Sequence, residues 1–324
     1  MPTDPRCSVV FLDAGTLPCA LPFEHLAPAV RERIVYQAFD TTAPADVAAR
    51  VADAEVVIVN KVKLTAELLA TAPRLQRIAV AAAGTDNIDL GAAAARGIGV
   101  FNVPDYGSES VAEHAIATLL ALRRQLLTYA AAAKDGRWSA ASHFCWHGPR
   151  IRDLQGALLG VVGRGRIGQA TARLAQGLGM RVRFAQRPGR PAAPDESPLD
   201  ELLAEADALS LHLPLTPDTR GLLNAERLAR LQRHTVLINT GRGAVVDAAA
   251  LADALRAGRL AGAAIDVLDV EPPPSTHPLL APDVPNLLLT PHCAWASEAA
   301  QARLASRLVA LVTDHLSGSV PPTP

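Results

Sequence analysis

Short apolar runs alternate with helical stretches along nearly the whole chain, and this alternation constrains the possible fold more than any other feature. In the second half the apolar runs recur at a spacing of roughly 20 to 28 residues, the length that one strand and a crossover helix require. Strands joined by crossover helices are parallel. The sequence therefore predicts an α/β fold built on parallel sheets.

The expected elements fall into two series, separated by a long helix and a loop. The first strands are expected at residues 9–13, 56–60, 78–82 and 99–103. A helix over residues 110–134 and a loop over residues 135–154 follow. The second strands are expected at residues 158–162, 181–185, 208–212, 236–239, 263–267 and 287–290. A last helix is expected over residues 297–315, before a tail rich in Pro and Ser that we expect to be frayed.

The length and composition allow two domains and exclude several classes of protein. A chain of 324 residues can bury two separate cores. Hydrophobic residues make up 49% and charged residues 19%, which excludes disorder for most of the length. The formal charge of -1 argues against a nucleic-acid partner. Only Lys61, Lys63 and Lys134 are lysines among the 31 basic residues, so arginine is abundant and any single Arg is weak evidence for function.

The sequence indicates a cytoplasmic protein without a membrane partner. No apolar run approaches the roughly 20 residues that span a bilayer. The first residues carry Asp4 and two prolines, which is not the pattern of a signal peptide. The four cysteines show neither Cys-x-x-Cys nor metal-ligand spacing, so we expect reduced thiols and no metal site.

Residues 158–168 form a predicted buried strand that leads into a Gly-x-Gly-x-x-Gly loop and then a helix. Gly163 allows the tight turn, Gly165 lets a pyrophosphate approach the backbone, and Gly168 permits close helix–strand packing. The N–H groups at the start of the helix would face the phosphates. We therefore predict dinucleotide binding by Gly163, Arg164, Gly165, Arg166, Ile167 and Gly168.

The end of the following strand predicts NADP in preference to NAD, which is kept as the alternative. NAD enzymes usually place an acidic residue there, about 20 residues after the glycine loop, to bind the ribose 2′-hydroxyl. This chain has Gln186, Arg187 and Pro188, and its first acidic residue is Asp195. A carboxylate would repel a 2′-phosphate, whereas Gln186 and Arg187 can accept one.

Three later segments, 236–243, 264–273 and 288–295, place polar residues just after an apolar strand, where ligands bind in an open α/β sheet. Arg242 can clamp a substrate carboxylate and polarise the adjacent carbonyl. Addition of a hydride to a ketone creates an alkoxide that must be protonated, and a histidine serves this step in both directions. His292, oriented by Glu271, fits that role.

The combined motifs resemble the D-isomer-specific 2-hydroxyacid dehydrogenases over nearly the whole chain. The glycine loop is followed by Asn-Thr-Gly-Arg-Gly, Asp-Val-x-x-x-Glu-Pro and Thr-Pro-His, and residues 81–89 and 110–115 also match. The resemblance implies a Rossmann-type doubly wound parallel sheet, residues 105–292, as the dinucleotide-binding domain. It is inserted into a smaller flavodoxin-like α/β substrate domain, residues 1–104 and 293–324, with the active site in the cleft. It also implies a homodimer.

The resemblance also implies roles for individual residues. Arg242, Glu271 and His292 become the catalytic residues. Lys61, Ala83, Gly84 and Trp295 join Arg242 and His292 in binding the substrate, with the N–H groups around Ala83 and Gly84 on its carboxylate. Asp266 would hold the nicotinamide carboxamide. The remaining cofactor residues, beside the glycine loop, are Val111, Gln186, Arg187, Pro188, His212, Leu213, Pro214, Thr219, Thr240, Gly241, Arg242, His292 and Ala294.

Within the family, residues 9–13, 60–61, 144–145 and 292–297 are most similar to the glycerate dehydrogenases, also called hydroxypyruvate or glyoxylate reductases. The implied reaction is the reversible reduction of hydroxypyruvate or glyoxylate by NAD(P)H to the D-2-hydroxy acid. The chain departs from the family pattern at Arg164, which either adds a phosphate contact or faces solvent. It departs also at Cys293, expected to be an inert packed thiol.

Three other functions stay open. Formate dehydrogenases resemble the pattern with Gln in place of Glu271, so Glu271 disfavours that activity. Corepressors such as the C-terminal-binding proteins keep the catalytic residues and act through nicotinamide-dependent oligomerisation and peptide binding. A nucleotide-binding scaffold without turnover would leave Arg242, Glu271 and His292 unexplained.

Overall fold

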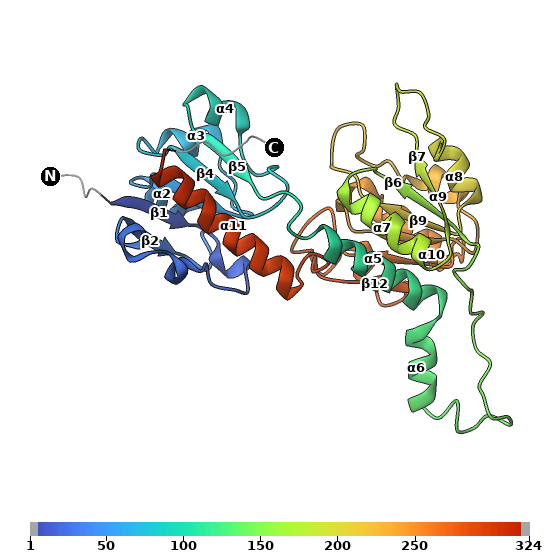
Figure 1. Cartoon of the computed structure of the whole chain (residues 1–324). Helices are drawn as coiled ribbons and strands as arrows, with labels where there is room; N and C mark the ends of the chain where they lie inside the picture. Colours follow the sequence, from blue (N-terminus) through green and yellow to red (C-terminus); the bar gives the residue numbers. More distant parts are fainter. Residues whose placement is uncertain (1–5, 319–324) are drawn as a thin grey trace. The chain divides into compact units, whose positions relative to one another are not determined.

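The computed structural model describes residues 6–318, which form two compact units (Figure 1). Unit 1 comprises the residues up to Gly107 and those from Ser297 onward, and unit 2 is Ser108–Ala296. The boundaries lie a few residues after the expected domain boundaries at 104 and 292, so that residues 293–296 belong to unit 2. The tail beyond residue 318, expected to be frayed, and Asp4 lie outside the described residues.

Unit 1 is a five-stranded sheet in the order β2-β1-β3-β4-β5, with every pair parallel. This is the 2-1-3-4-5 strand order of flavodoxin-like folds, as expected. Its elements are β1 (Cys7–Phe11), α1 (Pro28–Arg31), β2 (Ile34–Ala38), α2 (Val47–Val51), β3 (Val56–Val59), α3 (Ala66–Ala70), β4 (Arg77–Val80), α4 (Leu90–Ala95), β5 (Gly99–Asn102) and α11 (Glu298–Leu316).

Helix α11 brings the C-terminal part of the chain onto this sheet (Figure 1). The Arg77 guanidinium, on β4, donates a hydrogen bond of 2.8 Å to the Leu311 carbonyl. Leu304, Leu308, Leu311 and Val312 on the helix are buried. Residues from both ends of the sequence therefore form one unit, as the inserted-domain arrangement requires.

Strand β2 is an element that the sequence analysis missed. It lies at the edge of the sheet and is largely exposed, with Val35 at 39% and Tyr36 at 38% exposure. It has charged residues before it and Gln37 within it. An edge strand of this kind lacks the long apolar run that identifies a strand buried on both faces.

Unit 2 is a seven-stranded parallel sheet in the order β12-β11-β10-β9-β6-β7-β8. Its elements are α5 (Ser108–Arg123), α6 (Leu126–Lys134), β6 (Leu158–Val162), α7 (Arg166–Gly177), β7 (Arg181–Ala185), β8 (Glu196–Ser197), α8 (Leu199–Glu205), β9 (Ala208–Leu211), α9 (Ala225–Arg230), β10 (Val236–Asn239), α10 (Ala248–Arg256), β11 (Gly262–Ile265) and β12 (Leu287–Leu289). The six predicted strands of this unit are present, and the two-residue β8 was missed.

Alternate residues of the strands feed two separate cores, one on each face of the sheet. On β10, Leu237 packs with helices α8, α9 and α10, whereas Val236 and Ile238 pack with α5 and α7. The face toward α5 and α7 is rich in alanine, with Ala115, Ala172, Ala175, Ala208 and Ala264 all buried. Helices therefore cover both faces, which confirms the doubly wound fold.

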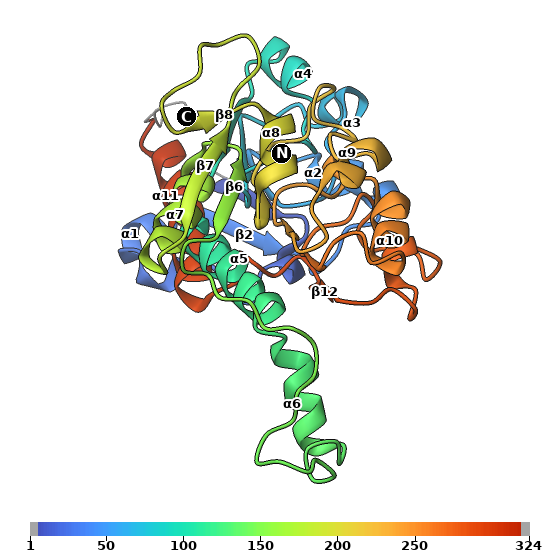
Figure 2. The ribbon, with the colours of Figure 1, turned by 90° about the vertical axis from the view of Figure 1, so that its right-hand side faces the viewer.

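The single helix expected over residues 110–134 is wrong. The chain forms α5, breaks at Gln125, and continues as α6. Gln125 has a left-handed backbone with φ of 55°, which cannot continue an α-helix. The break lets α6 leave the body of unit 2 (Figures 1 and 2).

Among residues 6–318, no helix has both the length and the apolar character needed to cross a membrane.

A buried carboxylate organises the loop after β3. Asp13 is 4% exposed and follows β1. Its Oδ1 accepts a hydrogen bond of 2.8 Å from the Asn60 N–H, and its Oδ2 accepts bonds of 2.5 and 3.0 Å from the N–H groups of Lys61 and Val62. Asp13 thus supplies acceptors to three consecutive N–H groups that the sheet does not pair.

We predict that Asp13→Ala lowers the free energy of unfolding by about 3 kcal/mol, because three N–H groups lose a charged acceptor in a buried position. Denaturation in urea followed by circular dichroism measures this loss. Hydrogen exchange at residues 60–62 should accelerate with it. Asp46→Ala is the matched control, since Asp46 makes only an exposed contact of 3.8 Å with Arg50. Equal stability of the two variants would contradict the role of Asp13.

Candidate active site

The carboxyl ends of the strands of unit 2 form the candidate site. The chain passes from β6 to β7 on one side and then returns to β9 on the other side of β6. In open α/β sheets this reversal of direction creates a crevice in which ligands bind. Gly163 follows β6, and His212 follows β9. A Cβ on Gly163 would lie 2.5 Å from the His212 carbonyl oxygen, so the two loops are in direct contact there.

The glycine loop fits a dinucleotide phosphate group. Gly163 has φ of 111°, and a Cβ on Gly168 would lie 2.0 Å from the Gly163 carbonyl oxygen. These two glycines are therefore required by the turn and by close packing. A Cβ on Gly165 would meet no atom within 4 Å, which leaves open space before the N-terminus of α7. No side chain caps that terminus. The N-terminus of a helix directs backbone N–H groups toward such a space, which suits a bound anion.

The residues after β7 are those expected to face the cofactor ribose. Gln186 is tied into its own loop, because its Nε2 donates a hydrogen bond of 2.8 Å to the Arg190 carbonyl. Arg187 and Pro188 are exposed. Arg164, in the glycine loop, pairs with Asp195 through contacts of 2.7 and 2.8 Å. Arg164 therefore does not simply face solvent.

His212, after β9, is held between two hydroxyl groups. Its Nε2 lies 2.9 Å from Ser210 Oγ and its Nδ1 lies 3.3 Å from Thr240 Oγ1. Burial lowers the pKa of His212 to about 4, so the imidazole is neutral at neutral pH. Further along this loop, Thr219 Oγ1 donates a hydrogen bond of 2.7 Å to the Pro214 carbonyl and thereby fixes the turn after Leu213.

The loop after β10 carries Arg242. Asn239, 1% exposed, accepts a hydrogen bond of 3.1 Å from the Gly241 N–H and donates one of 3.0 Å to the Arg242 carbonyl. A Cβ on Gly243 would lie 1.9 Å from the Leu268 carbonyl carbon, so this loop packs directly on the loop after β11. Asn239 is a positioning residue that the sequence analysis quoted in a motif but did not assign.

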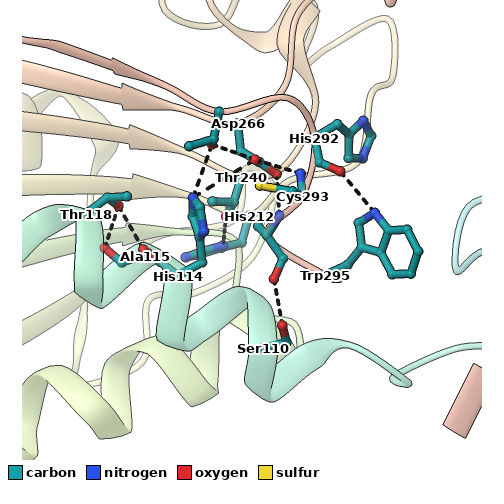
Figure 3. Close-up of polar contacts among 12 residues, drawn as sticks. Ser110, His114, Ala115, Thr118, His212, Thr240, Asp266, His292, Cys293 and Trp295 are labelled. Carbon is teal, nitrogen blue, oxygen red and sulfur yellow. Dashed lines mark hydrogen bonds and ion pairs between the residues drawn. The ribbon is translucent and has the colours of Figure 1, made fainter. Parts of the chain in front are cut away.

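Asp266, after β11, is the centre of the site (Figure 3). It is 3% exposed. Its Oδ1 accepts hydrogen bonds of 2.6 Å from Thr290 Oγ1 and 2.9 Å from the Cys293 N–H, and its Oδ2 accepts one of 3.0 Å from the Ala294 N–H. Its carbonyl also accepts a bond of 2.8 Å from the His292 N–H. The segment after β12 therefore wraps around Asp266.

The central pair is His292 and Glu271. His292 Nδ1 lies 2.6 Å from Glu271 Oε2, and both side chains are about one-third exposed, at 31% and 32%. Glu271 Oε1 accepts a second hydrogen bond, of 2.8 Å, from the Leu268 N–H, which fixes the carboxylate. A carboxylate on Nδ1 keeps a proton on that nitrogen, which leaves Nε2 as the nitrogen able to exchange a proton with a ligand.

Helix α5 supports this segment from below in Figure 3, and the sequence analysis assigned only Val111 on it. His114 Nε2 lies 3.2 Å from Thr290 Oγ1, and Ser110 Oγ donates a hydrogen bond of 2.8 Å to the Ala294 carbonyl. Val111 is buried. His114 and Ser110 lie in the motif 110–115 quoted for the family resemblance, which was the available signal.

Two residues beside His292 have clear surroundings. The Trp295 indole N–H donates a hydrogen bond of 3.0 Å to the His292 carbonyl. Cys293 is exposed, which corrects the expectation of a packed thiol. Desolvation and the nearby Asp266 carboxylate raise the pKa of Cys293, which keeps it in the unreactive thiol form.

The candidate substrate residues of unit 1 lie after β3 and β4. The Lys61 N–H is held by Asp13, as described above. The Ala83 carbonyl accepts a hydrogen bond of 2.6 Å from Asn102 Nδ2, which anchors the loop containing Gly84. These residues thus lie on loops fixed by side chains from neighbouring strands.

One further cluster brings potential metal ligands together in unit 1. Single ligand atoms of Cys7, Glu55 and His315 lie within 4.8 Å of one another. Burial raises the pKa of the Cys7 thiol to about 11, and Glu55 forms an ion pair with Arg74. A protonated thiol and a carboxylate already paired with arginine do not favour a divalent cation.

Comparison with known proteins agrees with this arrangement. A family model described as "D-isomer specific 2-hydroxyacid dehydrogenase, NAD binding domain" matches residues 116–294. The glycerate dehydrogenase of Methylorubrum extorquens is 40% identical over 284 residues, which cover 87% of this chain and 90% of that protein.

Solved structures show the same likeness. The TT0316 protein from Thermus thermophilus matches with a TM-score of 0.84 at 40% identity, covering 98% of this chain and 99% of that one. An NADPH-dependent glyoxylate/hydroxypyruvate reductase from Sinorhizobium meliloti, solved with NADP and malonate, has a TM-score of 0.79 at 31% identity. It covers 98% of this chain and 96% of its own. The family model and the extent of these matches show that the chain belongs to the D-isomer specific 2-hydroxyacid dehydrogenase family.

Proposed function

We propose that the chain reduces a small 2-keto acid, hydroxypyruvate or glyoxylate, to the corresponding D-2-hydroxy acid. The observation that carries this proposal is the 2.6 Å contact between His292 and Glu271. These two residues lie on the loops after β11 and β12, and the Arg242 loop after β10 packs on the first of them. All three loops come after the glycine loop in the sequence, and that loop fits a dinucleotide. The names of the glycerate dehydrogenase and the glyoxylate/hydroxypyruvate reductase that resemble the chain support this substrate class.

Each catalytic residue has a distinct task. When bound, NAD(P)H supplies the hydride that reduces the keto carbon of the substrate. Arg242 binds the substrate carboxylate through its planar fork and polarises the neighbouring carbonyl. His292 donates a proton from Nε2 to the alkoxide oxygen, and Glu271 stabilises the protonated imidazole. In the reverse direction His292 Nε2 accepts the hydroxyl proton.

Four residues are proposed to contribute to substrate binding beside Arg242 and His292. Ala83 and Gly84 supply backbone N–H groups for the carboxylate, and Lys61 adds a positive charge. Trp295, hydrogen-bonded to the His292 carbonyl, shapes the substrate site on unit 2. Asp266 contributes mainly by holding the His292 segment, because its carboxylate already accepts three hydrogen bonds from that segment.

The cofactor proposal is NADP in preference to NAD. It rests on the absence of an acidic residue directly after β7 and on the exposed Arg187 there. The S. meliloti relative is described as NADPH-dependent, which supports this choice.

The four cysteines are free thiols, which supports a location in the reducing cytoplasm.

Glu271 separates this function from formate oxidation. Removal of hydride from formate releases no proton that a base must accept, so the His292–Glu271 pair would have no task there. A corepressor or a scaffold would need no proton donor on Nε2. The proposed reductase is the function that uses all three residues.

A panel of 2-keto acids tests the function. We expect hydroxypyruvate and glyoxylate to cause loss of absorbance from NADPH, with a higher kcat/KM than from NADH. Formate with NAD⁺ or NADP⁺ should give no reaction. Absence of oxidation with every keto acid would overturn the reductase and favour the corepressor or scaffold. A clear preference for NADH would overturn the NADP proposal alone.

We predict that His292→Ala lowers kcat by a factor on the order of 10² to 10⁴, because the alkoxide loses its proton donor. Glu271→Gln should lower kcat less and change the pH profile. The affinity for NADPH, measured by nicotinamide fluorescence, should survive both changes. His234→Gln is the control, since His234 pairs with Asp207 away from these loops. A His292→Ala variant with near wild-type turnover would refute the assignment.

We also propose that the chain forms a homodimer through an arm, residues 124–153, that extends from unit 2 (Figures 1 and 2). The arm is ordered: Tyr129 stacks edge-on against Trp146 at 5.2 Å, and its hydroxyl donates to the Pro149 carbonyl. Its surface also carries several exposed apolar side chains among the charged ones. Its exposed large apolar side chains are Leu126, Leu127, Trp138, Phe144 and Ile151. Exposed apolar patches of this kind mark protein interfaces.

The arm predicts a mass in solution of about twice the 33.9 kDa of one chain. Phe144 is 92% exposed and Leu127 is 62% exposed. Changing both to Ser should weaken dimerisation by at least about tenfold, because each loses buried apolar area. Light scattering across a concentration series measures this. Leu90→Ser, an exposed leucine outside the arm, should leave the mass unchanged. A monomeric wild-type chain would refute the proposal.

A further inference from the structure

The glycine loop contains an arginine whose partner lies far along the sequence. Arg164 is the residue between Gly163 and Gly165. Its Nη1 donates to Asp195 Oδ1 at 2.7 Å and its Nη2 donates to Asp195 Oδ2 at 2.8 Å. The guanidinium thus binds a carboxylate with both arms of its fork, which is also the geometry in which arginine binds phosphate.

The neighbours of the pair hold it at one place. The Arg164 guanidinium carbon lies 4.5 Å from the centre of the Phe184 ring on β7. The Asp195 carbonyl accepts a hydrogen bond of 2.9 Å from the Phe184 N–H, and the next residue begins β8. Both partners are therefore held against Phe184 on β7. Phe184 lies two residues before Gln186, the first residue after the strand. This is the strand whose end holds the adenosine ribose in dinucleotide-binding folds.

The pair can be opened by a competing anion. The side chains of Arg164 and Asp195 are 42% and 46% exposed. Ion pairs this exposed contribute little to stability. The Arg164 guanidinium lowers the pKa of Asp195, so the carboxylate remains charged at neutral pH. Glu196 Oε1 accepts a longer hydrogen bond of 3.4 Å from Arg164 Nη1, and Glu196 Oε2 accepts one of 3.0 Å from the Ala193 N–H.

We propose that Arg164 is the residue that recognises the 2′-phosphate of the cofactor, and that Asp195 is a built-in competitor for the same guanidinium. The inference rests on the proposed binding of a nicotinamide dinucleotide at the glycine loop. With NADH the fork stays on Asp195. With NADPH the fork moves to the 2′-phosphate, which carries more charge than a carboxylate. Asp195 thereby sets how strongly the site distinguishes the two cofactors.

This assignment differs from the one drawn from the end of β7. There, Gln186 and Arg187 were expected to accept the phosphate. One of the two Gln186 Nε2 hydrogens is donated to the Arg190 carbonyl. Arg187 does not take part in the Arg164–Asp195 ion pair. A direct comparison of variants at Arg164 and Arg187 separates the two assignments.

The test measures binding to the purified full chain without substrate. Dissociation constants for NADPH and NADH are taken from nicotinamide fluorescence. Those for adenosine 2′,5′-bisphosphate and AMP are taken from calorimetry. Arg164→Gln should weaken NADPH and the bisphosphate at least about tenfold more than NADH and AMP, because one bidentate charged contact is lost. Asp195→Asn should strengthen NADPH relative to NADH by about threefold, the scale of an exposed ion pair.

Two controls make the result specific. Arg173→Gln removes an arginine of α7 that pairs with Glu109 at 2.7 Å, and it should leave the NADPH to NADH ratio unchanged. In the Arg164→Gln background, Asp195→Asn should no longer favour NADPH. Each variant should keep the wild-type melting temperature.

The outcomes separate this inference from the proposed function. Equal weakening of NADPH and NADH by Arg164→Gln would overturn it. So would a loss of discrimination confined to Arg187→Gln, which would leave the NADP proposal standing. If the wild type prefers NADH, the NADP proposal fails. The inference then still requires Asp195→Asn to shift the ratio toward NADPH, and no shift would overturn it.

Discussion

The buried carboxylate of Asp266 is the constraint on which the candidate site depends. A carboxylate removed from water is costly unless hydrogen bonds satisfy it. Here the donors come from Thr290, Cys293 and Ala294, all on the segment that follows β12. Satisfying the charge therefore forces that segment to fold around the end of β11. His292 lies in the middle of it, and its direction is a consequence of the way Asp266 is paired. Replacing Asp266 by an apolar residue would leave the same N–H groups unpaired, so the arrangement is difficult to change one residue at a time.

Unit 1 uses the same device in a different place. Asp13 follows β1 and binds the N–H groups after β3, where Lys61 lies. In each sheet a carboxylate at the end of one strand holds the loop at the end of the next strand in the sheet. The buried carboxylates make the hydrogen bonds that hold these loops. The side chains proposed for chemistry do not need to make them, and they remain partly exposed. Asp13 and Asn239 have structural roles of this kind, which explains why a search for reactive residues does not identify them.

How far the sequence predicts the structure follows from the range of the interactions involved. Strands buried on both faces, such as β9 and β10, appear as apolar runs, and the glycine loop is encoded by adjacent residues. Strand β2 was missed because an exposed edge has no such run, and the break at Gln125 was missed because nothing local demands a left-handed residue there. The pairing of Arg164 with Asp195 joins residues 31 positions apart. Such contacts depend on which strands become neighbours, so they become visible only once the sheet order is known.

His292 itself has a left-handed backbone, with φ of 53°. Most side chains avoid this region, and β-branched ones do so strongly, whereas Asn, Asp and His enter it more readily. The position therefore selects its occupant through backbone geometry as well as through chemistry. If the selection for catalysis were relaxed, the substitutions tolerated at residue 292 would mainly be Asn, Asp or Gly. A family member without turnover would then keep the shape of this loop while losing its proton donor.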